Sequence, residues 1–129
     1  KYVLVLQSDG NLVIYRSGTS VVMWATNVYL KNPSVNDKFA LYIQKDGNLV
    51  IYKQNASGQY KTVFWAANTS FVPGNDSYFD NVKYGFYLLQ DDGNFVLYYP
   101  QKTNSGMMYP IAATNSGNNI ISKTFGEFK

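Results

Sequence analysis

Residues 6–15 of the chain read Leu6-Gln7-Ser8-Asp9-Gly10-Asn11-Leu12-Val13-Ile14-Tyr15, and the same ten-residue pattern occurs twice more. It returns over residues 43–52 and again over residues 89–98, and all three copies share the skeleton Gln-x-Asp-Gly-Asn-x-Val-x-Tyr. Internal repeats at a spacing of tens of residues indicate an architecture built from similar supersecondary units. We therefore expect three units, over residues of about 1–37, 38–82 and 83–129, to form one domain that spans residues 1–129.

An Asp-Gly pair stands between two apolar, strand-like runs in each copy, as in Asp9-Gly10. This pair is typical of a β-hairpin, because glycine readily adopts the positive φ that a tight turn requires. A second turn and a third apolar run follow each motif, so each unit is predicted to be a three-stranded meander. The predicted strands cover residues 2–7, 11–15 and 21–27 in the first unit, 38–44, 48–53 and 62–68 in the second, and 84–90, 94–99 and 108–115 in the third.

The connectors between the units are long enough for one more edge strand each. They cover residues 28–37 and 69–82, whereas the first unit has no such leader and the tail, residues 116–129, has no further unit after it. We expect this tail to supply the strand that the first unit lacks, either within one chain or by exchange with a second. The predicted fold is all-β, with three four-stranded antiparallel sheets related by a pseudo-threefold axis, so that each sheet buries its apolar face.

The third strands of the first two units end in a Trp-Ala-x-Asn signature, at Trp24 and Trp65. We expect both indole rings to fill the centre between the sheets. The third unit has Ala112 where a third tryptophan is expected. Met107, Met108 or Tyr109 is predicted to occupy the space beside this alanine, since methionine adapts easily to irregular gaps in a core.

The composition limits the functions that the chain can have. Aromatic residues make up 17% and charged residues only 15%, a balance that favours sheet over helix. There is no cysteine and no histidine, so a disulfide framework is absent, as are the commonest metal ligand and the commonest general base. The net charge is +3, but the eleven Lys and Arg residues form no run that would indicate a phosphate-binding stripe. No apolar stretch approaches the roughly 20 residues that cross a bilayer, and no signal-peptide pattern is visible.

Hairpin and core formation do not explain why glutamine and tyrosine recur in all three motifs. Period-two alternation places Asn11, Val13 and Tyr15 on one face of a strand, and the hairpin brings Gln7 and Asp9 towards that face. Two amides, a carboxylate, a phenol and an aliphatic patch then converge in one shallow site, three times over. This set suits a sugar, because these polar groups exchange hydrogen bonds with hydroxyls and aliphatic carbons pack on the C–H face of a pyranose.

The triplicate motif, with Trp-Ala-x-Asn strands after its first two copies, closely resembles the monocot mannose-binding lectins, also called bulb-type or snowdrop-like lectins, over essentially the whole chain. The resemblance implies a β-prism II fold, no metal or other cofactor, and recognition of D-mannose. In that family Asp and Asn bind the axial 2-hydroxyl, Gln the 3-hydroxyl and Tyr the 4-hydroxyl, while Val contacts ring carbons. The carbohydrate-binding residues carried over to this chain are Gln7, Asp9, Asn11, Val13, Tyr15, Gln44, Asp46, Asn48, Val50, Tyr52, Gln90, Asp92, Asn94, Val96 and Tyr98.

The chain also departs from the plant pattern. Many plant members have a cysteine between the Asp and Asn of one motif, where this chain has Gly10, Gly47 and Gly93. The lack of this cysteine, the lost third tryptophan and the long connectors favour a bacterial, fungal or animal relative, or one module of a lectin-like bacteriocin. The implied partners are mannose-containing glycans or a surface polysaccharide, and the implied location is secreted or extracellular. Whether two chains pair as a homodimer is left open.

Other functions are less well supported by the residues. An enzyme is not expected, because a glycosidase needs two carboxylates across a cleft at roughly 5 to 9.5 Å and three of the eight acids already belong to the motifs. A nucleic-acid binder is not expected either, because it would need Lys and Arg clustered among aromatics. A lectin-like bacteriocin stays open, and so does a β-prism scaffold with silent sugar sites. A site could be silent because Tyr78, Phe79 or the connector before Tyr84 covers its motif.

Overall fold

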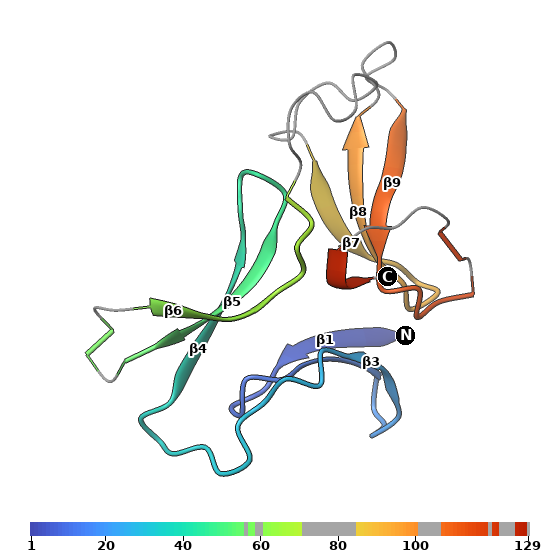
Figure 1. Ribbon diagram of the computed structural model, residues 1–129. Helices are drawn as coiled ribbons and strands as arrows, with labels where there is room; N and C mark the ends of the chain where they lie inside the picture. The colour runs from blue at the N-terminus through green and yellow to red at the C-terminus, as the bar shows by residue number, and fades with distance from the viewer. Residues whose placement is uncertain are drawn as a thin grey trace.

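The computed structural model describes residues 1–55, 57–58, 61–70, 85–100, 107–118, 120–121 and 126–128. Within these residues the chain forms three separate antiparallel sheets of three strands each, with the strand orders β1-β2-β3, β4-β5-β6 and β7-β8-β9. Figure 1 shows the three sheets arranged around a common centre, with the short 3-10 helix η2 close to that centre. The prediction of an all-β chain is confirmed, and each sheet is a meander of strands that follow one another in sequence.

The strands match the predicted ones to within two residues at each end. They are β1 (Tyr2–Leu6), β2 (Leu12–Arg16), β3 (Val22–Ala25), β4 (Lys38–Ile43), β5 (Leu49–Gln54), β6 (Lys61–Ala66), β7 (Phe86–Leu89), β8 (Phe95–Pro100) and β9 (Met108–Ala113), and η2 covers Gly126–Phe128. The middle strand of each sheet is the return strand of the Gln-x-Asp-Gly-Asn-x-Val-x-Tyr motif, which places every motif at the centre of its sheet.

The prediction of a fourth strand in each sheet is wrong for the described residues. The first connector, residues 28–37, is described throughout and forms no strand. Its backbone groups are used in other contacts, because the Leu30 N–H donates to the Asp9 carbonyl at 2.8 Å and the Asp37 N–H donates to the Ser34 carbonyl at 3.1 Å. Most of the second connector, residues 71–82, lies outside the described residues.

The tail, predicted to complete the first sheet, has another position. Within its described residues no strand is added to that sheet, and η2 instead lies against the end of the second unit. The Glu127 N–H donates to the Ala67 carbonyl at 2.6 Å, and the Asn68 side-chain amide donates to Glu127 Oε1 at 3.0 Å. This contact places Phe128, which is fully buried, in the core beside Trp24 and Trp65.

Phe128 therefore occupies the place that the sequence assigned to the segment 107–109. Met107 is 48% exposed, and neither Met108 nor Tyr109 is among the described residues that pack on the core, so the prediction that one of the three replaces the third tryptophan is wrong. The ring of Phe128 also packs against Tyr87 and Phe95 of the third unit, with centroid distances of 6.3 Å to each. One residue of the tail thus joins the three units through their aromatic side chains.

The sheets turn one face inward onto a single hydrophobic core. Leu12 and Ile14 of β2 are fully buried there, and their counterparts on the other middle strands are buried in the same way. The register shifts between Ile14 and Tyr15, and an equivalent shift occurs in each of the other two sheets. Because such a bulge lets two successive residues face the same side, both Met23 and Trp24 pack on the core.

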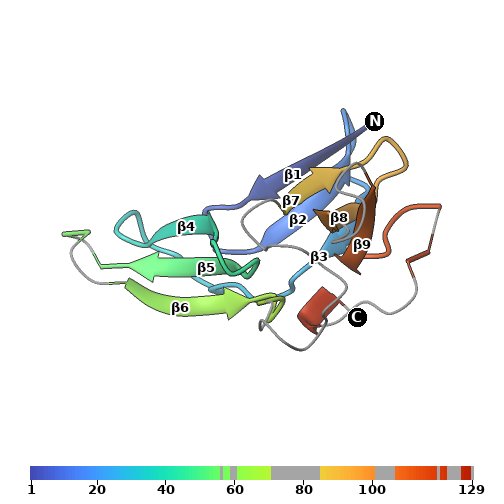
Figure 2. The ribbon, with the colours of Figure 1, turned by 90° about the horizontal axis from the view of Figure 1, so that it is seen from above.

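Each of the three turns packs against an aromatic ring of the next unit. A Cβ placed on Gly10 would lie 2.6 Å from a ring carbon of Phe64, so only glycine fits between the turn and this ring. The pairs are Gly10 with Phe39 and Phe64, Gly47 with Tyr99, and Gly93 with Tyr2. The first unit therefore packs on the second, the second on the third and the third on the first. Figure 2, turned by 90° from Figure 1, shows the strands of the second unit at one side of the molecule and those of the first and third units together at the other.

Candidate functional site

The three motifs form hairpins of the same geometry. They are called motif one (residues 7–15), motif two (residues 44–52) and motif three (residues 90–98). In motif one the Gln7 N–H donates to the Asn11 carbonyl and the Gly10 N–H donates to the Gln7 carbonyl, both at 2.9 Å. The same pair of bonds occurs in the other motifs at 2.8 to 3.0 Å. With Gly10 at φ 93°, this is a three-residue loop that ends in a glycine of left-handed conformation, as predicted from Asp-Gly.

The side chain of the motif aspartate stabilises the turn by a hydrogen bond to the backbone. Its Oδ1 accepts a hydrogen bond from the N–H of the motif asparagine two residues later, at 2.9 Å in all three copies. Such an Asx turn fixes the carboxylate with respect to the backbone. One oxygen of Asp9 or Asp46 is thereby engaged, and the second oxygen is left to accept a bond from a ligand. The aspartate consequently has a structural role in addition to the sugar-binding role predicted from sequence.

Glutamine and tyrosine of each motif are hydrogen-bonded to each other. The Gln44 Nε2 donates to the Tyr52 hydroxyl at 2.6 Å, and the Gln7–Tyr15 and Gln90–Tyr98 pairs make the same bond. This bond leaves the glutamine Oε1 as an acceptor and the tyrosine O–H as a donor. The structure thus brings the predicted pair together and presents one group of each hydrogen-bonding type.

The motif valine lies in the strand between the glutamine and the tyrosine. Val13, Val50 and Val96 are 2%, 3% and 0% exposed. They pair with the alanine of the third strand, as Val13 pairs with Ala25, so their face of the sheet is closely packed. With at most 3% of their surface exposed, the three valines offer almost no surface for contact with a sugar ring in this structure.

The motif asparagine connects the hairpin to the end of the third strand. In motif one its Oδ1 accepts bonds from the Thr26 hydroxyl at 2.8 Å and from the Asn27 N–H at 3.0 Å. The corresponding donors are the Thr69 N–H for Asn48, at 3.2 Å, and the Thr114 hydroxyl for Asn94, at 3.3 Å. The amide oxygen is thus used inside the protein, and the amide nitrogen is the end of Asn11 or Asn48 that would meet a ligand.

The asparagine that ends the Trp-Ala-x-Asn signature of the first two units, and the equivalent Asn115 of the third, adopts the same backbone conformation. Asn27, Asn68 and Asn115 have φ values of 57°, 55° and 53°. Asparagine is one of the few residues other than glycine that adopt this left-handed conformation readily. No role for this asparagine was predicted from sequence, although its recurrence at the end of all three strands is a signal that could have indicated one.

Motif one opens onto a pocket of about 600 Å³. Gln7 and Asp9 line one side, and the connector residues Tyr29, Lys31 and Pro33 line the other. The Leu30 N–H bond to the Asp9 carbonyl, at 2.8 Å, attaches the connector to the turn at this point. Motif one is therefore accessible and is extended on one side by a segment outside the motif.

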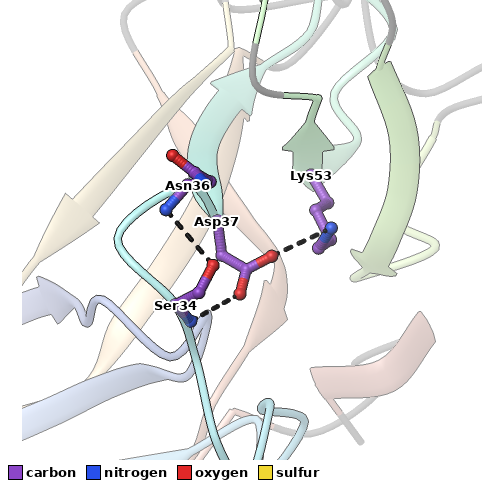
Figure 3. A network of polar contacts seen from close by, with 4 residues as sticks. All are labelled: Ser34, Asn36, Asp37 and Lys53. Carbon is purple, nitrogen blue, oxygen red and sulfur yellow. Dashed lines mark hydrogen bonds and ion pairs between the residues drawn. The ribbon is translucent and has the colours of Figure 1, made fainter.

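A polar network fixes the far end of the same connector (Figure 3). Asp37 accepts a hydrogen bond from the Ser34 N–H at 2.7 Å and forms an ion pair with Lys53 of β5 at 3.2 Å. The Asn36 N–H donates to Ser34 Oγ at 3.2 Å. The hydrogen bond from the Ser34 backbone, followed by the contact with Lys53, holds the pKa of Asp37 below its ordinary value. The connector is thus anchored to the first unit at one end and to the second unit at the other.

Motif two is accessible and has an aromatic and cationic border. Asp46 is exposed, and the ring of Tyr42 stands at 88° to the ring of Tyr52 with a centroid distance of 5.2 Å. Lys61 Nζ lies 4.5 Å from the centroid of Tyr42 and donates to its hydroxyl. These residues were not predicted from sequence as part of a site, because Tyr42 and Lys61 have no counterpart in the repeated skeleton.

The turn of motif two is supported from behind by buried tyrosines of the third unit. The Tyr87 hydroxyl donates to the Gly47 carbonyl at 2.8 Å, and Thr69 Oγ1 donates to the same carbonyl at 3.0 Å. Burial raises the pKa of Tyr87, and burial together with the charge of Asp46 raises the pKa of Tyr99 to about 12. Both phenols are therefore neutral at physiological pH.

Motif three is covered by the tail. Asn94 is 0% exposed, and a Cβ on Gly117 would lie 2.7 Å from the Asp92 carboxyl carbon and 2.8 Å from Asn94 Cβ. The Ser116 hydroxyl donates to the Gly93 carbonyl at 2.8 Å, which fixes the tail over the turn. The candidate covers from sequence, Tyr78 and Phe79 with the connector before Tyr84, lie outside the described residues.

Tyr98 of motif three is also shielded by its neighbour. The ring of Phe86 stacks on Tyr98 with a centroid distance of 5.7 Å and an angle of 29° between the planes. Tyr15 and Tyr52 face Val3 and Ala40 at this position instead. The five motif residues come together in all three units. The difference lies in the asparagine, which is fully buried in motif three, whereas Asn11 and Asn48 stay partly exposed.

Among the described residues, no helix has the length and apolar character that crossing a membrane would require. No protein-family model, curated protein or solved structure matches the chain.

Proposed function

We propose that the chain is a carbohydrate-binding lectin that recognises D-mannose and mannose-containing glycans through its Gln-x-Asp-x-Asn-x-Val-x-Tyr motifs. The proposal includes a β-prism II arrangement of the three sheets and an extracellular glycan or surface polysaccharide as the partner. It rests on the chemistry of the motifs and on their resemblance to the bulb-type lectins. No catalytic step is part of it.

One observation carries the proposal. In each motif the same network of hydrogen bonds fixes an aspartate, an asparagine, a glutamine and a tyrosine on one hairpin. Hairpin stability alone does not need glutamine paired with tyrosine on three separate sheets. The groups left over in motifs one and two are a carboxylate oxygen, an amide carbonyl, an amide N–H and a phenol O–H, which match the donors and acceptors of neighbouring sugar hydroxyls.

The number of sites follows from what covers them. Ser116 and Gly117 of the tail lie against the turn of motif three, where Asn94 is fully buried, whereas Asn11 and Asn48 of motifs one and two stay partly exposed. We therefore propose two working sugar sites per chain. A shallow site with about four polar contacts that compete with water should bind a monosaccharide at roughly millimolar Kd, about 4 kcal/mol. Useful affinity would then come from several sites that engage one branched or polymeric glycan.

Calorimetric titration tests the proposal directly. D-mannose and methyl α-mannoside are expected to give weak heats with a stoichiometry near two, and galactose is the control that should give none. A variant with Asp9, Asp46 and Asp92 all changed to alanine should give no heat with either mannoside. Full binding of polymeric mannose by this triple variant would contradict the assignment of the motifs as sugar sites. No heat for any sugar with the unaltered chain would leave a scaffold with silent motifs.

A further inference from the structure

We infer that the connector residues from Tyr29 to Pro33 form a second saccharide subsite beside motif one, so that this site takes an oligosaccharide of at least two residues. The inference rests on the proposed lectin function and adds the size of the ligand at one of its sites. It follows from the pocket, from the side chains that line it and from the bonds that fix the connector.

The pocket belongs partly to the motif and partly to the connector. Gln7 and Asp9 are the residues of the sugar motif that line the pocket, whereas Asn11, Val13 and Tyr15 lie outside its lining, so the pocket adjoins the motif on its Gln7 and Asp9 side. The volume of about 600 Å³ falls within the range of about 300 to 1,000 Å³ that is usual for small-molecule sites. A single hexose held at the motif would fill only part of this space and would leave the connector side unoccupied.

The connector side has the chemistry of a sugar subsite. Tyr29 is 49% exposed, and its ring and that of Pro33 offer flat apolar surfaces for the C–H face of a pyranose. Lys31 is exposed, and in the described part of the chain no carboxylate lies within ion-pair distance of it. Its ammonium can therefore donate to hydroxyls of a second residue.

The subsite is held in place before any ligand binds. The Leu30 N–H bond to the Asp9 carbonyl, at 2.8 Å, fixes the middle of the segment to the turn of motif one. The ion pair between Asp37 and Lys53, at 3.2 Å, fixes the end of the connector to β5. Affinity improves when a binding segment does not have to be ordered on binding. The connector is thus suited to receive a second sugar residue at a fixed distance from the first.

The test compares one sugar residue with two. Methyl α-mannoside and α-linked mannobioses are titrated into the full chain, with calorimetry for affinity and nitrogen–proton correlation spectra to locate each ligand. Tyr29→Ala is the test variant. Val35→Ala is its matched control, because Val35 belongs to the same connector, is 86% exposed and lies outside the pocket lining.

The inference predicts that a mannobiose shifts the amide signals of both motif one and residues 29–33, whereas the monosaccharide shifts those of the motif. Tyr29→Ala should weaken mannobiose binding at motif one about fivefold and leave monosaccharide binding unchanged, as expected for the loss of one aromatic contact. Val35→Ala should change neither. Equal affinity for one and two residues, with the signals of residues 29–33 unmoved, would overturn the subsite but leave the lectin proposal intact. Failure of every mannoside to shift motif one would overturn both.

Discussion

Phe128 stands edge-on against Trp24, with ring centroids 5.6 Å apart and an angle of 86° between the planes. The same ring lies 6.0 Å from Trp65, so one residue of the tail completes the aromatic centre of the molecule. The third unit contributes only Ala112 at the position of the two tryptophans. The core is therefore shared between the three repeats and a segment that belongs to none of the repeated strands.

Replacing Phe128 by alanine should lower the free energy of unfolding by about 3 to 5 kcal/mol, because it removes a fully buried ring and leaves a cavity. Glu127→Ala is the matched control: it loses a hydrogen bond from the side chain of exposed Asn68, worth about 1 kcal/mol. Urea unfolding followed by tryptophan fluorescence measures both, since Trp24 and Trp65 contact the ring. Deletion of residues 116–129 should destabilise at least as much, and an unchanged melting curve for the truncated chain would refute a structural role of the tail.

Gly47→Ala should be strongly destabilising for two separable reasons. The backbone has φ 87°, which costs an L-residue about 1 to 2 kcal/mol, and the added Cβ would overlap the Tyr99 hydroxyl. Gly58→Ala isolates the first reason, because Gly58 has φ 74° and nothing lies within 4 Å of its added Cβ. Chemical denaturation should therefore show a larger loss for Gly47→Ala than for Gly58→Ala. Tyr99→Phe in the Gly47→Ala background should recover part of the difference, and equal losses for the two alanine variants would contradict the packing explanation.

Conservative changes of the motif aspartates should reveal how many sites work. In Asp46→Asn the side-chain oxygen can still accept the Asn48 N–H bond that holds the turn, but an NH₂ group replaces the second oxygen. We expect the mannoside stoichiometry to fall from two to one for this variant and likewise for Asp9→Asn, with melting temperatures unchanged. Asp92→Asn should leave the stoichiometry at two, since the tail covers motif three. A loss of one site in the Asp92 variant would show that the tail moves away when sugar binds.

The protein should lose stability at alkaline pH. Burial raises the pKa of Tyr87, and it raises the pKa of Tyr99 from 10.0 to about 12, so the folded state favours both neutral phenols. The stabilisation that the raised pKa values give to the folded state is fully present below pH 10, the ordinary pKa of tyrosine. It is lost as the pH rises from 10 towards 12 and beyond. Thermal melting between pH 8 and 12, with tyrosinate absorbance recorded in parallel, measures this loss. The Tyr87→Phe and Tyr99→Phe double variant should show a shallower decline, and an equally steep decline would assign the loss to other groups.

The elements near the motifs could be predicted from sequence because their signals are local. Asp9-Gly10 and its two repeats specify the hairpin through glycine φ and short-range hydrogen bonds, and the alternation of apolar residues specifies the strands on either side. The meeting of Gln7 with Tyr15 also follows from alternation, since both lie on the outer face of one hairpin. Local pattern was sufficient for all these features.

The tail and the connectors could not be predicted in the same way. Their positions depend on contacts between residues far apart in sequence, such as Glu127 with Ala67 or Gly117 with Asp92. The first connector has the length of a strand, but its backbone bonds go to the Asp9 turn and into its own Ser34–Asp37 turn rather than to a sheet edge. The length of the connector was the basis for predicting a fourth strand. The hydrogen bonds that place the connector elsewhere cannot be predicted from amino-acid composition.

The cyclic packing of the turn glycines fixes the number of repeats. In an open array each unit contacts only its neighbours, so units can be gained or lost one at a time at the ends. Here the Gly93 turn of the third unit packs on Tyr2 of the first, so among the described residues the contacts between units form a closed ring. Duplication that added further motifs would therefore have to copy all three units together, and under the proposed function the residues outside the motifs are the ones left to vary what each motif binds.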